Sequence, residues 1–80
     1  MSKYAHCIFE EQSSGARVTK IWKASSASGM FLGWVKWWAH WRRYCFFPGP
    51  DLLFDCNCLW DIADFVKQQT EFRKEERKTR

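Results

Sequence analysis

The stretch FLGWVKWWAHWRRYCFFPGP, residues 31–50, decides how this 80-residue chain folds. It holds four of the six tryptophans, and aromatic residues dominate the runs on both sides of AHW, residues 39–41. Two runs of aromatic and β-branched residues joined by a short break are typical of a hairpin. Pro48 and Pro50 end the second run, because proline has no N–H to donate to a neighbouring strand. The stretch therefore predicts a hairpin with its loop at residues 39–41.

The segments that flank the hairpin predict more strands. RVTKIWKA, residues 17–24, has strand composition, and Tyr4–Phe9 is expected to add a short strand. LLF, residues 52–54, is long enough for one short edge strand.

The last third of the chain predicts a helix. Its apolar positions follow the spacing i, i+3, i+4, i+7, which is typical of an amphipathic helix; they are Leu59, Ile62, Ala63 and Val66, with Phe65 and Phe72 beside them. Asp55 or Asn57 is expected to cap the start of this helix by accepting a hydrogen bond from a free backbone N–H.

The chain is therefore expected to be a single α+β domain, residues 1–80, with an antiparallel sheet of three to four strands and one C-terminal helix packed on one face. We assign residues 17–54 to the sheet and residues 55–80 to the helix with its basic tail. Residues 1–16 are either flexible or a short extra strand. A domain of this size needs a dense core, and the aromatic content of 19% fits that demand.

Charge is distributed in three zones along the chain. Residues 1–50 carry seven basic and two acidic side chains, residues 51–66 carry four acidic and no basic ones, and residues 67–80 carry six basic and three acidic ones. The basic zones and the net charge of +4 favour an anionic partner.

Alternation along the first hairpin strand separates its side chains into two sets. Phe31, Gly33, Val35 and Trp37 form an apolar set, which we assign to the core, with Gly33 leaving room for the helix to approach. Leu32, Trp34, Lys36, Trp38 and His40 form the other, mixed set. The hairpin register decides which side chains of the second strand join each set, and the sequence leaves it open.

The mixed set predicts a binding face. Its candidate residues are Trp34, Lys36 and Trp38, with Arg42 or Arg43 from the second strand and Lys20 beyond. Aromatic rings and cations on a sheet suit single-stranded nucleic acid, but tryptophan and arginine also dominate protein-binding hot spots. A third interpretation is purely structural, since exposed aromatic rings also shield themselves by packing against neighbouring cations.

Other kinds of site have weaker support in the sequence. Cys56 and Cys58 are spaced C-x-C rather than C-x2-C, so neither a metal site nor a cofactor is expected. Asp61 and Asp64 stand near a helix start, where the helix dipole explains them without catalysis, so we expect no catalytic residues and no enzyme. No run is apolar enough to cross a membrane, and the absence of a signal peptide favours the cytoplasm with reduced cysteines.

Three segments resemble a group of small proteins encoded by bacteriophages and prophages, whose function is unassigned. They are LGWVKWW, WRRYCFFP and CLWDIADFV, which match the pattern LGx[IV]KW, WRxYxFFP and CLxDIxxF over about residues 17–70. The resemblance implies a phage or mobile-element setting and carries over no catalytic residues.

These observations lead to a functional hypothesis with one alternative. The chain is expected to be a non-catalytic phage accessory protein in the cytoplasm of a host bacterium. It would bind and inhibit or redirect a host protein or protein–nucleic-acid complex, for example in counter-defence such as anti-CRISPR activity, or in host takeover. The alternative is a single-stranded nucleic-acid-binding protein that uses the same face. A homodimer is also left open, because exposed strand edges invite self-pairing.

Overall fold

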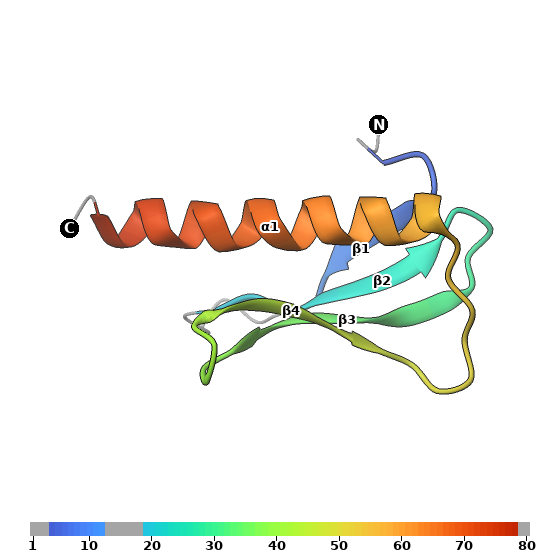
Figure 1. The fold of residues 1–80 in the computed structure, drawn as a ribbon, viewed down its shortest axis with the longest axis horizontal. Helices are drawn as coiled ribbons and strands as arrows, with labels where there is room; N and C mark the ends of the chain where they lie inside the picture. Colours follow the sequence, from blue (N-terminus) through green and yellow to red (C-terminus); the bar gives the residue numbers. More distant parts are fainter. Residues whose placement is uncertain (1–3, 13–18, 79–80) are drawn as a thin grey trace.

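A computed structural model describes residues 4–12 and 19–78 of the chain. Four strands, β1 (Cys7–Glu11), β2 (Trp22–Ser26), β3 (Phe31–Trp38) and β4 (Arg43–Pro48), form one antiparallel sheet in the order β1-β2-β3-β4. Helix α1 (Cys56–Lys78) follows and lies across one face of the sheet, as Figure 1 shows. The α+β fold predicted from the sequence is confirmed.

Helix α1 begins at an aspartate cap. Asp55 Oδ1 accepts a hydrogen bond from the backbone N–H of Cys58 at 2.8 Å, and the Asp55 carbonyl accepts the first helical hydrogen bond, from Leu59 at 3.0 Å. Such a cap satisfies a backbone donor that has no partner within the helix. Of the two caps predicted, Asp55 is the one that forms.

The core lies between α1 and the sheet in two adjoining clusters. Cys7, Ala24, Leu32 and Ile62 form the first, and Trp22, Val35 and Tyr44 form the second. Phe9, Phe46 and Val66 pack against both clusters and join them. The ring of Phe65 stacks on Phe9 at 4.0 Å between centroids, so the helix contributes aromatic as well as aliphatic contacts.

A β-bulge changes which side chains of β3 enter the core. Ala24 pairs with Gly33 and Ser25 pairs with Phe31, so Leu32 is the extra residue on β3. A bulge of this kind interrupts the alternation of side chains. Leu32 is consequently buried in the core, whereas Phe31 turns to the other face, where its ring lies 5.6 Å from that of Trp34. The prediction that placed Phe31 in the core and Leu32 outside it is wrong at these two positions and right for Val35.

Gly33 makes room for a neighbouring strand and not for the helix. A Cβ atom at this position would collide with the backbone carbonyl oxygen of Phe47 and would lie 2.8 Å from Cζ of Phe46, closer than a side chain tolerates. The prediction that Gly33 leaves room for the helix is therefore wrong, because the ring of Phe46 occupies that space.

Three further predictions are corrected by the structure. Residues 52–54 form no strand, and the first strand begins at Cys7 rather than Tyr4. The helix is also rotated relative to the expected stripe: Ile62 is buried, but Leu59, Ala63 and Phe72 are exposed.

Candidate binding surfaces

The face of the sheet opposite α1 carries an aromatic and basic surface, which we call the open face. It consists of Phe31, Trp34, Lys36 and Trp38 of β3 with Cys45 and Phe47 of β4. Trp34 pairs with Phe47 and Lys36 with Cys45, so these side chains lie side by side on the pleat. Among the described elements, none covers this face in Figure 1.

The aromatic rings of the open face contact one another and hold a cation. The Trp38 ring lies 6.1 Å from Phe47 and 5.0 Å from His40. Lys36 Nζ lies 4.6 Å from the centre of the Phe47 ring, within the range of a cation–π interaction. Even with these contacts, Trp34 is 37% and Trp38 38% exposed. Both tryptophans therefore keep surface that a partner can bury.

The basic residues predicted for this face are not all placed on it. Arg42 lies in the exposed turn between β3 and β4 with a φ of 53°. Arg43 pairs with Trp38 at the end of the open face, and it also lines the groove described below. The ammonium of Lys20 forms an ion pair with Glu11 at 3.8 Å.

Lys20 lies on the other side of the sheet. Its backbone N–H donates to the Tyr44 hydroxyl at 3.1 Å, and Tyr44 belongs to the core cluster under the helix. The structure therefore brings Trp34, Lys36 and Trp38 together and leaves Lys20 out.

The position of Trp37 is explained by its contacts within the fold, without a binding partner. Its ring packs edge-on against Tyr44 at 5.3 Å, and the guanidinium of Arg73 from α1 lies over it at 5.4 Å. Trp22 makes the same kind of contact with Tyr44, also at 5.3 Å. These two tryptophans build the helix-covered side of the sheet, in contrast to Trp34 and Trp38.

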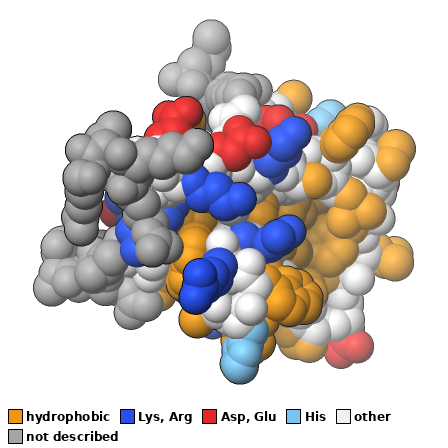
Figure 2. Space-filling model, turned by 60° about the vertical axis from the view of Figure 1, so that its left-hand side comes forward, with side chains coloured by type: hydrophobic (Ala, Val, Ile, Leu, Met, Phe, Trp, Pro, Cys, Tyr) orange, Lys and Arg blue, Asp and Glu red, His pale blue; other side chains and the backbone are white. Residues whose placement is uncertain are grey.

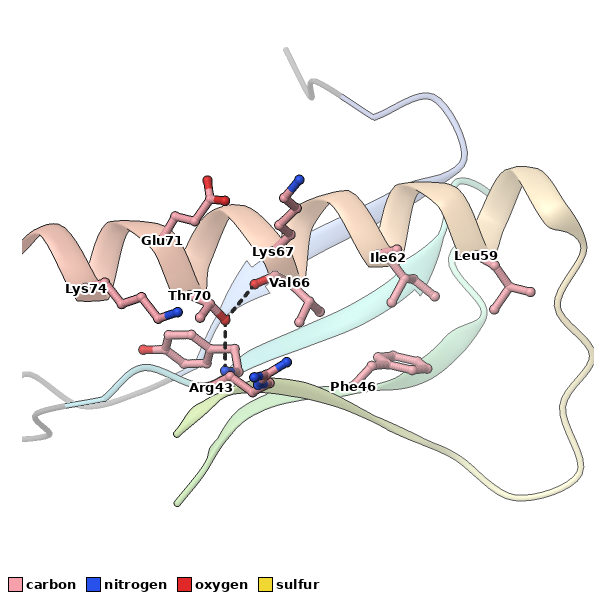
Figure 3. A pocket seen from close by; sticks show the side chains of 11 residues that line it. Arg43, Phe46, Leu59, Ile62, Val66, Lys67, Thr70, Glu71 and Lys74 are labelled. Atoms are coloured by element: carbon pink, nitrogen blue, oxygen red, sulfur yellow. Dashed lines mark hydrogen bonds between the residues drawn. The ribbon is translucent and has the colours of Figure 1, made fainter. Parts of the chain in front are cut away.

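A second surface, which the sequence did not predict, is a groove of about 630 Å³ between the outer edge of β4 and α1. We call it the β4 groove, and Figure 3 shows the side chains that line it. Its lining consists of Arg43, Tyr44, Phe46, Leu59, Ile62, Ala63, Val66, Lys67, Thr70, Glu71 and Lys74. Basic side chains gather beside hydrophobic ones on this side of the molecule in Figure 2. No sequence pattern predicts the groove, because its apolar wall consists of helix positions that periodicity assigns to the core.

Asp61 and Asp64 hold the segment before β1. The Tyr4 hydroxyl donates to Asp64 Oδ2 at 2.8 Å, and the His6 backbone N–H donates to Asp61 Oδ2 at 3.0 Å. Burial and the hydrogen bond to this carboxylate raise the pKa of Tyr4 above its usual value. The two carboxylates thus have structural partners. The prediction that the helix dipole explains them is wrong, because the first turn of α1 contains no acidic residue.

Two of the four cysteines meet in the core. The Sγ atoms of Cys7 and Cys58 lie 3.3 Å apart, and burial raises the pKa of the Cys7 thiol to about 12.

Within residues 4–12 and 19–75, whose side chains are described, no three His, Cys, Asp or Glu side chains are grouped as metal ligands. In the same part of the chain, no helix has the length and apolar character needed to cross a bilayer.

Comparison with known proteins gives one informative relative. The chain is 30% identical, over 61 residues, to an uncharacterized 9.3 kDa protein of Acholeplasma phage L2, and the match covers 76% of this chain and 78% of the phage protein. The chain belongs to the family of this small phage protein. No protein-family profile and no solved structure matches the chain. The membership agrees with the predicted resemblance in its general form, a small phage protein of unassigned function.

Proposed function

We propose that this chain is a non-catalytic phage accessory protein that binds a host macromolecule through the open face and so inhibits or redirects it. The observation that carries the proposal is the position of Trp34 and Trp38. Both lie outside the core clusters, on the sheet face that α1 does not cover, with more than a third of their surface exposed. Large aromatic side chains beside cations are the residue types that dominate binding hot spots.

The family supports the setting of this proposal. A protein encoded by a phage meets the proteins and nucleoprotein complexes of its host bacterium, so we place the partner in the host cytoplasm. Inhibition of a defence system and redirection of host machinery are both compatible with a small binding protein of this kind.

Paired tryptophan substitutions test the proposal. The variant Trp34→Ala/Trp38→Ala removes the exposed rings of the open face, and Trp60→Ala is the matched control, because Trp60 is 75% exposed on α1. The tagged proteins are used to capture partners from a nuclease-treated lysate of a host bacterium, and the affinity of the purified partner is then measured. We expect one stoichiometric partner that the native chain and Trp60→Ala bind and the double variant does not.

Two results would contradict the proposal. One is the recovery of no stoichiometric partner by the native chain. The other is equal binding by the native chain and a folded double variant, with folding checked by circular dichroism.

Single-stranded nucleic acid is the second candidate partner. Lys36 over the Phe47 ring, flanked by Trp34 and Trp38, combines a cation with rings on which bases can stack. Binding of this kind weakens steeply with added salt, because counterions are released from the phosphates. A labelled oligonucleotide that shows no binding at low salt would eliminate this candidate.

A further inference from the structure

We propose that the β4 groove receives an extended, acidic segment of a partner protein, which pairs with β4 as an added strand. The groove is a different surface from the open face, and the proposal stands independently of the function proposed above.

The first support is the hydrogen-bonding pattern of β4, which is an edge strand. In an antiparallel pair, residues that bond to the neighbouring strand alternate with residues whose N–H and C=O point away from it. The Tyr44 N–H points away, since it donates to Thr70 Oγ1 of the helix at 3.0 Å. By the same alternation, the N–H and C=O of Phe46 point away from β3, along the edge that borders the groove. These groups are the ones that an added strand uses.

The second support is the apolar wall opposite this edge. Leu59, Ala63 and Val66 line the groove from α1, and Leu59 is 49% exposed. Figure 3 shows Leu59 and Val66 projecting from the helix toward β4, on either side of Phe46. A strand added to β4 places every second side chain toward the helix, so small apolar side chains at alternate positions would be buried there.

The third support is charge. Arg43, Lys67 and Lys74 line the groove together with one carboxylate, that of Glu71. Figure 3 shows the Lys74 side chain reaching toward β4, whereas the charged ends of Lys67 and Glu71 point away from it. A segment with acidic side chains near this basic end gains charge-assisted hydrogen bonds that a neutral segment lacks.

The same features argue against other occupants. A second copy of this chain related by a twofold axis would bring its own basic groove against the first, so that like charges would meet. Pro48 ends the edge without an N–H, which limits pairing to a short segment. A nucleic acid strand has no peptide groups to pair with those of Phe46.

A peptide-library selection tests the proposal. Random 12-residue peptides displayed on phage are selected on the immobilised chain, and enriched peptides are synthesised for affinity measurement. We expect enriched sequences to combine acidic residues with apolar residues at alternate positions. On binding, the Phe46 amide should shift in the NMR spectrum and exchange more slowly with solvent, because it becomes hydrogen-bonded to the peptide.

Two charge-reversed variants locate the binding. Lys67→Glu/Lys74→Glu changes exposed side chains of the groove, and Lys23→Glu/Lys36→Glu makes the same change in net charge on the opposite side of the sheet. We expect the groove variant to bind the peptides at least about tenfold more weakly, as the loss of a charge-assisted contact predicts, and the control to bind them normally.

Four outcomes of the peptide experiments would overturn the proposal. They are the absence of enriched peptides, enrichment without acidic residues, equal weakening by both double variants, and amide shifts that avoid Phe46. Protection of the Phe46 amide in a concentration-dependent dimer without peptide would also overturn it, by assigning the edge to a second copy.

Discussion

The hydroxyl of Thr70 connects helix α1 to the outer edge of β4. Thr70 Oγ1 accepts the backbone N–H of Tyr44 at 3.0 Å and donates to the Val66 carbonyl at 3.0 Å. A helix side chain thus satisfies a strand donor that has no neighbouring strand, and it does so at the end of the β4 groove. This bond ties the helix, which lies across the face of the sheet, to the outer edge of β4.

Thr70→Val is expected to lower the free energy of unfolding by about 1–2 kcal/mol, because the Tyr44 N–H loses its acceptor at a partly buried position. Urea denaturation measures the change. Thr70→Ser keeps the hydroxyl and is expected to remain within about 0.5–1 kcal/mol of the native chain, since it loses only a methyl group. Equal stability of the Val variant and the native chain would show that the bond contributes nothing.

Gly33→Ala is expected to destabilise the fold by about 1–3 kcal/mol, the usual cost of overpacking a core. The added Cβ would collide with the backbone carbonyl oxygen of Phe47, and it would also lie 2.8 Å from Phe46 Cζ. In a double-mutant cycle measured by thermal or urea unfolding, Phe46→Leu should relieve part of the cost of Gly33→Ala, because the ring atoms that collide are absent. Strictly additive effects of the two substitutions would show that the Phe46 ring contributes nothing to the strain and that the Phe47 carbonyl accounts for it.

The raised pKa of the Cys7 thiol is expected to lower the free energy of unfolding in alkaline solution. Burial raises its pKa from 9.0 to about 12 in the folded chain, so the folded state keeps a proton that the unfolded state releases. The contribution of this thiol to the free energy of unfolding is complete below pH 9. It is lost as the pH rises toward 12, since the unfolded state then binds fewer protons than the folded state. The raised pKa of Tyr4 acts in the same direction.

Urea unfolding between about pH 8 and 11 measures this dependence, over the range in which an ordinary thiol titrates. Cys7→Ala should show a shallower decline than the native chain. Cys56→Ala is the control, because Cys56 is exposed, and its decline should match that of the native chain. Equal slopes for the two alanine variants would refute the role of the Cys7 thiol.

The cysteines should also differ in their rates of alkylation. Cys56 is exposed at the first residue of α1, whereas Cys7 is fully buried. Iodoacetamide should therefore modify Cys56 first and Cys7 only on unfolding, because the thiolate must form and be reached by the reagent. Peptide mass mapping after timed quenching gives the order. Modification of Cys7 as fast as Cys56 in the folded chain would contradict the buried position.

The open face was partly predictable from local pattern. Alternation placed Trp34, Lys36 and Trp38 on one side of β3, because side-chain direction in a strand depends only on position parity. Parity failed at Phe31 and Leu32, where the bulge exchanges the two sides. The prediction that Lys20 belongs to the open face failed for another reason. Its partners Glu11 and Tyr44 are brought to it by strand pairing, and they are not its neighbours in the chain.

The sequence by itself determined the four strands and the helix that form, although it also predicted a strand at residues 52–54 that is absent. Pro48, the cap at Asp55 and the periodicity around Ile62 act within a few residues of themselves, so local sequence is enough to specify strand and helix there. Only the tertiary structure decided how α1 is rotated on the sheet. The packing of Phe65 and Val66 against Phe9 and Trp22 turns Leu59 and Ala63 outward, and so opens the β4 groove. That rotation depends on contacts between residues far apart in the chain, and helical spacing alone does not fix it.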